Sequence, residues 1–286
     1  MSEIAWLNGR WMRPARAKVS AEDRGFLFGD GVYEGIVSYG GRAWALQRHL
    51  RRLARSLHEV GIEGVDVAEI GRLCEQAARR SRAAGAFIYV QVTRGAAPRS
   101  HDWTPDVRPT IFLTARAAKP YPPECWTGGC RVVTLADERW GRCDVKSVNL
   151  LANVLAFHRA RAAGAFEGVL VRDGAVTEGT HSGVFIVRKG VAITREDGPH
   201  VLPSITRDFA LEIAADLGVP AERRRFTVQE LLGADEAFLV GTASMIMPIS
   251  HADGRAIAGG APGPVTLRFM EGYKDRIARR DDAPRD

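Results

Sequence analysis

The sequence predicts an α+β protein of two domains. Helical and strand patterns are mixed along its 286 residues without a regular strand–helix–strand rhythm, and this length allows one large core or two modest ones. The segment KPYPP, residues 119–123, is so rich in proline that it can continue neither a helix nor a strand. We therefore expect an N-terminal domain over residues 1–118, a linker over 119–123 and a C-terminal domain over 124–286.

The N-terminal half contains two helical patterns followed by two strands. Apolar residues recur at spacings of three and four from Leu46 to Val60 and stop at Gly61, which indicates an amphipathic helix. A second helical pattern covers residues 67–84. The stretches AFIYVQVTRG and PTIFLTA are rich in β-branched and aromatic residues, so we expect strands there.

The C-terminal half alternates helices with hairpins. RVVTLAD is predicted as a strand, and VNLLANVLAFHRARAAG as a helix that ends at Gly164. VLVRDGAVTE and VFIVRKGVAIT are predicted as hairpins, around a central Asp-Gly and a central Lys-Gly turn. SITRDFALEIAADLG is a helix that Ser204 or Thr206 could cap, and EAFLVGTASMIMPI is a long strand that bends at Gly241.

The composition argues against nucleic acid, membranes and metals as partners. The net charge is +6, but the arginines are interleaved with acidic and apolar residues and form no basic block. No apolar run has the length of a membrane span, and the N-terminus lacks a secretion signal, so we expect a cytoplasmic protein. The four cysteines form no C-x-x-C pair, which indicates neither a zinc site nor a disulfide framework.

Lysine is rare in this chain, and one lysine has an unusual position. The lysines are Lys18, Lys119, Lys146, Lys189 and Lys274. Lys146 alone leads into a long apolar run, at the expected end of a strand in the second domain. Arginine cannot readily lose its proton to become a nucleophile, whereas a desolvated lysine can. Lys146 is therefore a candidate nucleophile, and the alternative is an ordinary surface lysine.

Other polar groups lie where predicted elements of the second half end. Glu178 closes the strand after the first hairpin turn. The helix start near Ile205 and the bend at Gly241-Thr242 offer backbone N–H groups and a hydroxyl, which suit a phosphate. No Walker loop occurs, and the Gly-Asp-Gly at residues 29–31 is not a complete dinucleotide motif. A nucleophilic lysine, a carboxylate and phosphate sites together suggest pyridoxal phosphate.

A series of motifs resembles the fold type IV pyridoxal phosphate transaminases, the class IV aminotransferases. From about Asn8 to Met270 the matching stretches, in order, are VSAEDRGFLFGDGVYEGI, LQRHLRRL, QVTRGAAPRSH, RWGRCDVKSVNLLANVLA, AVTEGTHSGVFIV, SITRD and LVGTASMIMPI. The resemblance implies the fold of the D-amino acid aminotransferases, with a smaller N-terminal α/β domain and a larger C-terminal domain that has a β-barrel-like core.

The same resemblance implies roles for individual residues toward pyridoxal 5′-phosphate. Lys146 matches the Schiff-base lysine, which also acts as the base at Cα, and Glu178 matches the partner of the pyridine nitrogen. Arg52 matches the arginine that binds the phosphate. Ile205 and Thr206 match the phosphate contacts at a helix terminus. Thr242 matches the second phosphate cradle, and Leu202 matches the side chain packed against the ring.

Arg99 and His101 bear on substrate choice. They lie two residues apart in RGAAPRSH, so on an extended segment both side chains point the same way. This spacing resembles the carboxylate-binding pair of the D-amino acid aminotransferases, which comes from the neighbouring subunit and works with a tyrosine matching Tyr33. The resemblance thus implies a homodimer that moves the amino group of a D-amino acid, such as D-alanine, to 2-oxoglutarate by a ping-pong mechanism, giving pyruvate and D-glutamate.

One departure and three alternatives bear on this assignment. The D-amino acid enzymes commonly have a serine-rich stretch ending in asparagine after the glutamate, where this chain has Thr180, His181, Ser182 and Gly183. His181 is titratable near neutral pH and could contact the cofactor hydroxyl or face solvent.

A branched-chain amino acid transaminase would not need Arg99 and His101. An aminodeoxychorismate lyase would eliminate pyruvate without 2-oxoglutarate, and a noncatalytic basic binding protein would need none of these residues. The preferred donor side chain is left open.

Overall fold

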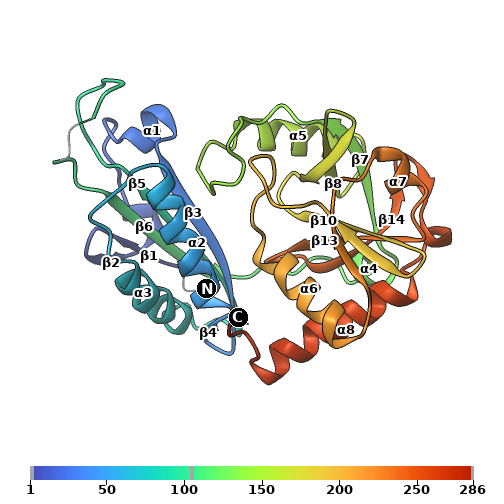
Figure 1. The fold of residues 1–286 in the computed structure, drawn as a ribbon. Helices are drawn as coiled ribbons and strands as arrows, with labels where there is room; N and C mark the ends of the chain where they lie inside the picture. The colour runs from blue at the N-terminus through green and yellow to red at the C-terminus, as the bar shows by residue number, and fades with distance from the viewer. Residues whose placement is uncertain (1–2, 104–105, 285–286) are drawn as a thin grey trace. The chain divides into compact units, whose positions relative to one another are not determined.

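The computed structural model describes residues 3–103 and 106–284 (Figure 1). Contacts between residues divide the chain into two compact units. Within the described residues, unit 1 covers the ranges Met1–Lys119, Val145–Asn149 and Asp282–Asp286, and unit 2 covers Pro120–Asp144 and Leu150–Asp281. The short segment Val145–Asn149 thus packs with the N-terminal residues, although unit 2 flanks it in the sequence.

Unit 1 is built on a six-stranded sheet with the order β2-β1-β6-β5-β3-β4, in which neighbouring strands are antiparallel. The strands are β1 (Ile4–Leu7), β2 (Arg10–Met12), β3 (Gly31–Tyr39), β4 (Arg42–Ala43), β5 (Gly85–Thr93) and β6 (Thr110–Ala117). The helices are η1 (Pro14–Arg16), α1 (Arg24–Phe28), α2 (Leu46–Glu59) and α3 (Val67–Arg80).

Helices α2 and α3 lie on one face of this sheet and enclose the core of unit 1 (Figure 1). Because side chains alternate along a strand, Val32 and Ile36 of β3 enter that core, whereas Tyr33 lies on the opposite face. Leu50 and Leu53 of α2 pack against them. The helix predicted from Leu46 is therefore confirmed, with its apolar stripe facing the sheet.

The second predicted helix, 67–84, is too long at its C-terminal end. Helix α3 stops at Arg80, where the Ser81 Oγ donates to the carbonyl of Ala78 at 2.8 Å. Arg82 then takes a left-handed backbone conformation with a φ of 53°. Such a conformation ends a helix and is usually adopted by glycine. Because the residue here is an arginine, the sequence does not indicate the end of the helix.

Unit 2 contains a nine-stranded sheet with the order β12-β11-β10-β13-β14-β7-β8-β9, and β15 pairs with β14. Its strands are β7 (Cys130–Ala136), β8 (Glu167–Arg172), β9 (Ala175–Gly179), β10 (Gly183–Arg188), β11 (Val191–Thr194), β12 (Ala221–Arg223), β13 (Glu236–Gly241), β14 (Met245–Ala252) and β15 (Arg255–Ala256). The sheet curls into a half-barrel, which confirms the predicted barrel-like core.

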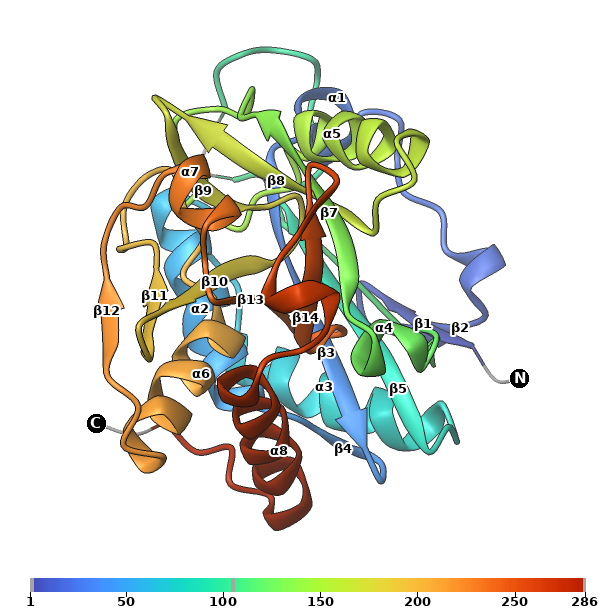
Figure 2. The same ribbon diagram turned by 90° about the vertical axis from the view of Figure 1, so that its right-hand side faces the viewer.

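The helices of unit 2 surround this sheet. They are α4 (Glu124–Thr127), α5 (Leu151–Ala162), α6 (Ile205–Asp216), α7 (Val228–Leu232), η2 (Ala258–Gly260) and α8 (Pro264–Arg279). Helices α6 and α8 run side by side (Figure 2), joined by Arg276, which pairs with Glu212 and Asp216 at 2.6 Å each. Among the described helices, none has the length and hydropathy required to cross a bilayer.

Two predicted hairpins of unit 2 are confirmed, and one predicted strand is wrong. The Asp173-Gly174 and Lys189-Gly190 turns have positive φ at both residues, as a two-residue hairpin requires. The predicted single strand 236–249 is instead the antiparallel pair β13 and β14, with Gly241 opposite Met245. Most residues of both strands are buried and apolar. The sequence of the two strands therefore resembles one continuous apolar strand.

The segment around Lys146 also differs from its prediction. Lys146 does not end a strand, since β7 stops at Ala136, and it lies in unit 1. Ser147 forms an isolated bridge with Val32 of β3, and the Val148 N–H donates to the Gly31 carbonyl at 3.0 Å. These contacts keep residues 148–150 out of the predicted helix, which begins at Leu151.

Candidate functional site

Lys146 is held by backbone contacts to β3 and α2. Its carbonyl accepts a hydrogen bond from the Tyr33 N–H at 3.0 Å, and its own N–H donates to the Ser56 Oγ at 3.3 Å. Val145 next to it is buried in the core of unit 1. The Lys146 Nζ consequently lies 4.3 Å from the centroid of the Tyr33 ring, so the structure brings the predicted nucleophile and the predicted substrate-binding tyrosine together.

Arg52 lies in a buried cluster of three charged or titratable side chains. Its Nε and Nη2 donate to the two carboxylate oxygens of Glu34, each at 2.8 Å, and the His49 Nδ1 lies 2.7 Å from the same carboxylate. Burial opposes ionisation of Glu34, but the charge of Arg52 outweighs it and holds the pKa of that carboxyl well below its usual range. Burial lowers the pKa of His49, so a neutral His49 donates to an ionised Glu34.

Arg99 and His101 meet at the ring of Phe28 in unit 1. The Arg99 Cζ lies 5.2 Å from the centroid of that ring, and the His101 ring lies 5.6 Å from it. Both residues follow the end of β5 at Thr93 and are exposed. Their segment is not a strand, and both side chains nevertheless lie near the same ring.

Glu178, at the end of β9, is buried in a network of unit 2. One carboxylate oxygen accepts from Arg139, and the other accepts from the Leu202 N–H at 3.2 Å. Arg139 also pairs with Asp137 at 2.8 Å. Burial works against the charge of Arg139, but Asp137 and Glu178 outweigh it and raise the pKa of Arg139 above its usual value. Arg139 therefore remains a cation and favours the ionised form of Glu178.

The sequence alone does not single out Arg139 or Asp137 as site residues. The stretch LADERWGRC places several charges just after a predicted strand, which is where sites are often built. The sequence pattern does not indicate which of these charged side chains is buried. The pairing of Arg139 with Glu178 depends on the position of β9 and of the chain near Leu202.

The N-terminus of α6 has the features of an anion site. Ser204 caps the helix by accepting from the Arg207 N–H at 3.3 Å, so Ser204 rather than Thr206 is the cap. Ile205 and Thr206 occupy the first two helical positions, whose N–H groups have no acceptor within a helix. Helix α6 packs against β13, and Thr242 follows directly after that strand.

The turn at Thr242 is tight. A Cβ placed on Gly241 would lie 2.7 Å from the Ser244 Oγ, so only glycine leaves this hydroxyl in place. The predicted phosphate-binding residues of unit 2 thus lie on neighbouring elements, although Thr242 belongs to a hairpin turn and not to a bend within one strand.

The loop after Glu178, where this chain departs from the serine-rich pattern, is anchored by a buried carboxylate. Glu167 accepts from the Thr180 Oγ1 at 3.2 Å, the His181 N–H at 2.8 Å and the Ser182 Oγ at 2.7 Å. The His181 side chain is 44% exposed, with its Nδ1 3.3 Å from Glu167. His181 therefore contributes to holding its own loop.

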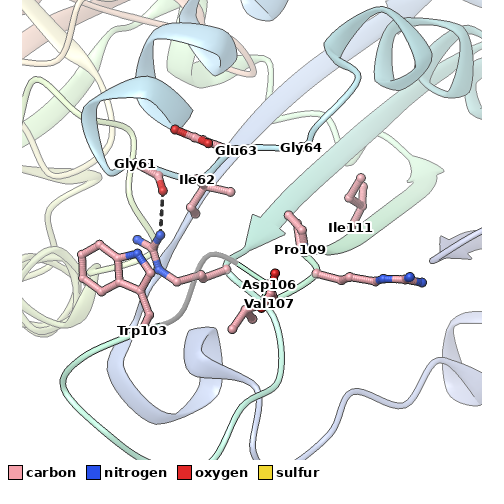
Figure 3. A pocket seen from close by; sticks show the side chains of 11 residues that line it. Gly61, Ile62, Glu63, Gly64, Trp103, Asp106, Val107, Pro109 and Ile111 are labelled. Atoms are coloured by element: carbon pink, nitrogen blue, oxygen red, sulfur yellow. Dashed lines mark hydrogen bonds between the residues drawn. The ribbon is translucent and has the colours of Figure 1, made fainter.

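A cavity of about 690 Å³ in unit 1 is separate from these residues (Figure 3). Its lining includes Gly61, Trp103 and Asp106 but none of the predicted site residues. Arg94 on its wall donates to the Gly61 carbonyl at 2.7 Å and lies 4.0 Å from the centroid of the Trp103 ring. Through these contacts Arg94 joins the turn after α2 to Trp103, which is a structural role.

Each unit by itself carries side chains of a chemical kind that pyridoxal phosphate requires. Unit 1 contributes an amine at Lys146 and a buried guanidinium at Arg52. Unit 2 contributes a carboxylate at Glu178 whose ionised form is favoured by Arg139, and the first turn of the twelve-residue helix α6. An amine, an anion for a ring nitrogen and N–H donors for a phosphate are what this cofactor requires.

Comparison with known proteins gives one family. A family model described as amino-transferase class IV matches residues 31–252. A D-alanine aminotransferase of Bacillus licheniformis is 39% identical over 272 residues, which cover 94% of this chain and 95% of that protein. A D-alanine aminotransferase of Staphylococcus epidermidis is 38% identical over 275 residues, covering 95% and 97% of the two chains.

Several solved structures with a similar fold are branched-chain amino acid aminotransferases. The Escherichia coli structure has a TM-score of 0.89 at 25% identity and covers 95% of this chain and 93% of its own. A second such enzyme, solved with pyridoxamine 5′-phosphate, has a TM-score of 0.89 at 29% identity, covering 97% and 94% of the two chains.

Proposed function

Because the chain belongs to the class IV aminotransferases, which use pyridoxal 5′-phosphate, we propose that it moves the amino group of a D-amino acid such as D-alanine to 2-oxoglutarate. The products are then pyruvate and D-glutamate. The observation that carries this proposal is the 39% identity, over nearly the whole chain, to a protein named D-alanine aminotransferase. The convergence of Arg99 and His101 on Phe28 supports it, since both can donate hydrogen bonds to an α-carboxylate.

The chemistry divides between the cofactor and the residues around it. When bound, pyridoxal phosphate supplies a carbonyl for exchange of the amino group and a ring that accepts the electrons of the Cα–H bond. The Lys146 amine would hold the cofactor and, when free, would accept the Cα proton and return it. The Tyr33 ring directs the Lys146 amine.

The remaining site residues hold the cofactor in place. Glu178 keeps the ring nitrogen protonated, and Arg139 supports the charge of Glu178. We assign the phosphate contacts and the packing against the ring to Arg52, Ile205, Thr206, Thr242 and Leu202. The same residues bind first the amino acid that donates the amino group and then the 2-oxo acid that accepts it. We therefore expect ping-pong kinetics.

The proposed assembly is a cytoplasmic homodimer. Leu151, Val154 and Leu155 on one side of α5 are 72%, 59% and 47% exposed, and their spacing of three and four residues forms an apolar stripe that a second copy can cover. The four cysteines are unpaired, as is usual in a reducing compartment.

Substrate class is tested with a panel of donors. D-alanine, L-alanine and L-leucine are each supplied with 2-oxoglutarate, and the 2-oxo acid product is measured. We expect turnover with D-alanine to exceed both L-donors by orders of magnitude. A preference for L-leucine supports the second candidate, a branched-chain transaminase, which is the activity named for the two similar structures described above. Pyruvate release from aminodeoxychorismate without 2-oxoglutarate indicates a lyase.

Replacing Arg99 by leucine should weaken the binding of both substrates. D-alanine and 2-oxoglutarate each present an α-carboxylate, and losing a charge-assisted pair of hydrogen bonds should raise both KM values about 30-fold, equivalent to about 2 kcal/mol. His101→Ala should act in the same direction but less strongly. Cofactor affinity should stay unchanged. Wild-type KM values in both variants would restrict the assignment to the family level.

Mixing a weakly binding variant with an inactive one tests whether Arg99 serves the partner subunit. If Arg99 acts across a dimer, a mixed dimer of Arg99→Leu and Lys146→Ala contains one site with both wild-type residues. Unfolding and refolding the variants together should then restore sites with wild-type KM for D-alanine. If the mixture shows only the KM of Arg99→Leu, Arg99 acts within its own subunit or not at all.

A further inference from the structure

Arg24, at the start of α1, directs its guanidinium at a loop without regular secondary structure. It is only 4% exposed. Its Nη1 donates to the carbonyls of Ser100 at 2.6 Å and Asp102 at 3.2 Å, and its Nη2 donates to that of His101 at 3.4 Å. Because the donors of a guanidinium are fixed in one plane, three successive carbonyls bound to it lose their freedom together. Arg24 therefore restrains the backbone of residues 100–102.

The opposite edge of Arg24 is also held. Its Nε donates to the Asp30 carboxylate at 2.9 Å, and the same carboxylate accepts from the Arg94 Nε at 2.8 Å. Burial opposes ionisation of Asp30, but hydrogen bonds from Arg94 and Arg24 outweigh it and hold the pKa of Asp30 below its usual value. Asp30 is thus ionised at neutral pH and fixes the position of Arg24.

Phe28 connects this anchor with the predicted carboxylate-binding pair. Arg24 and Phe28 are four residues apart on α1, and the Arg24 Cζ lies 4.9 Å from the centroid of the Phe28 ring. Arg99 and His101 contact the same ring at 5.2 and 5.6 Å. The backbone of the loop and the two side chains it carries are therefore both tied to α1.

We propose that Arg24 is a positioning residue for substrate binding, which sets the direction in which Arg99 and His101 meet the α-carboxylate. The inference rests on the proposed function. Arg24 is buried and acts through the loop carbonyls and Phe28. A guanidinium binds a carboxylate through two parallel hydrogen bonds, so its placement matters, and an error of about 1 Å can remove much of the effect.

The first test is Arg24→Met, which removes the donors and keeps the length of the side chain. The KM values for D-alanine and 2-oxoglutarate should each rise about tenfold, while kcat at saturation and the amount of bound cofactor stay near wild type. Arg24→Lys keeps a charge beside Asp30 but cannot reach three carbonyls with a planar fork, so its KM values should resemble those of Arg24→Met. Wild-type KM values in Arg24→Met would overturn the inference.

Arg94→Met is the matched control. Arg94 is 6% exposed and shares Asp30 with Arg24, but its other donors reach the carbonyls of Val60 and Gly61 and not those of residues 100–102. Its replacement should lower the melting temperature about as much as Arg24→Met but raise both KM values far less, because the hydrogen bonds from Arg24 to residues 100–102 remain. An equal rise in KM for the two variants would show a general loss of stability and refute the positioning role.

A double variant shows the route by which Arg24 acts. Once Arg99 is replaced by leucine, the main group that Arg24 positions is gone, so adding Arg24→Met should raise KM little further. Multiplying effects would mean that Arg24 acts independently of Arg99, and the inference would be wrong. Failure of the wild type to transaminate D-alanine would instead reject the proposed function, which separates the two outcomes.

Discussion

Lys146→Ala is expected to abolish both covalent attachment of pyridoxal phosphate and transamination. The methyl group can neither bond to the cofactor nor accept the Cα proton, so kcat should fall by about 10³-fold or more. The fold should persist, because the Lys146 contacts with Tyr33 and Ser56 use backbone atoms. Loss of yellow colour and of borohydride-reducible cofactor measures the first effect, and single-turnover kinetics measures the second.

Lys189→Ala provides the control for this variant. Lys189 is exposed in the turn between β10 and β11, so its replacement should leave colour and turnover unchanged. With only five lysines in the chain, peptide mapping after borohydride reduction identifies the modified residue unambiguously. A labelled lysine other than Lys146, with normal turnover in Lys146→Ala, would refute the assignment.

Glu178→Gln is expected to bind the cofactor and to turn over slowly. A neutral amide no longer favours a protonated ring nitrogen, so removal of the Cα proton should slow by about 10²- to 10³-fold. The side chain keeps its shape, and Arg139 retains its pair with Asp137, so the network should survive. The primary isotope effect with Cα-deuterated D-alanine should increase, since proton removal becomes more strongly rate-limiting.

Asp137→Asn distinguishes the role of Glu178 from the general effect of disturbing Arg139. Both carboxylates pair with Arg139, but we propose only Glu178 as the partner of the ring. Asp137→Asn should therefore lower the melting temperature and change kcat only a fewfold. Comparable losses of kcat in the two variants would assign the effect to Arg139, and unchanged turnover in Glu178→Gln would remove Glu178 from its role.

Elements specified by neighbouring residues were predictable. The period of apolar residues in α2 depends only on spacing, and the Asp-Gly and Lys-Gly turns need only two residues that tolerate positive φ. The motifs around Lys146 and Glu178 were equally local, which is why the family was evident before the fold. Local patterns failed at 236–249, because two buried strands of one hairpin carry the same apolar signal as one strand.

By itself the sequence determined the approximate positions of several helices and of two hairpins, the family and the residue types of the candidate site. Only the tertiary structure decided which distant groups meet these residues. It placed Val145–Asn149 beside β3, paired Arg139 with Glu178, and aimed Arg24 at the carbonyls of residues 100–102. The physical reason is that a buried charge takes its partner from whichever element packs against it, and packing depends on contacts between residues far apart in the chain.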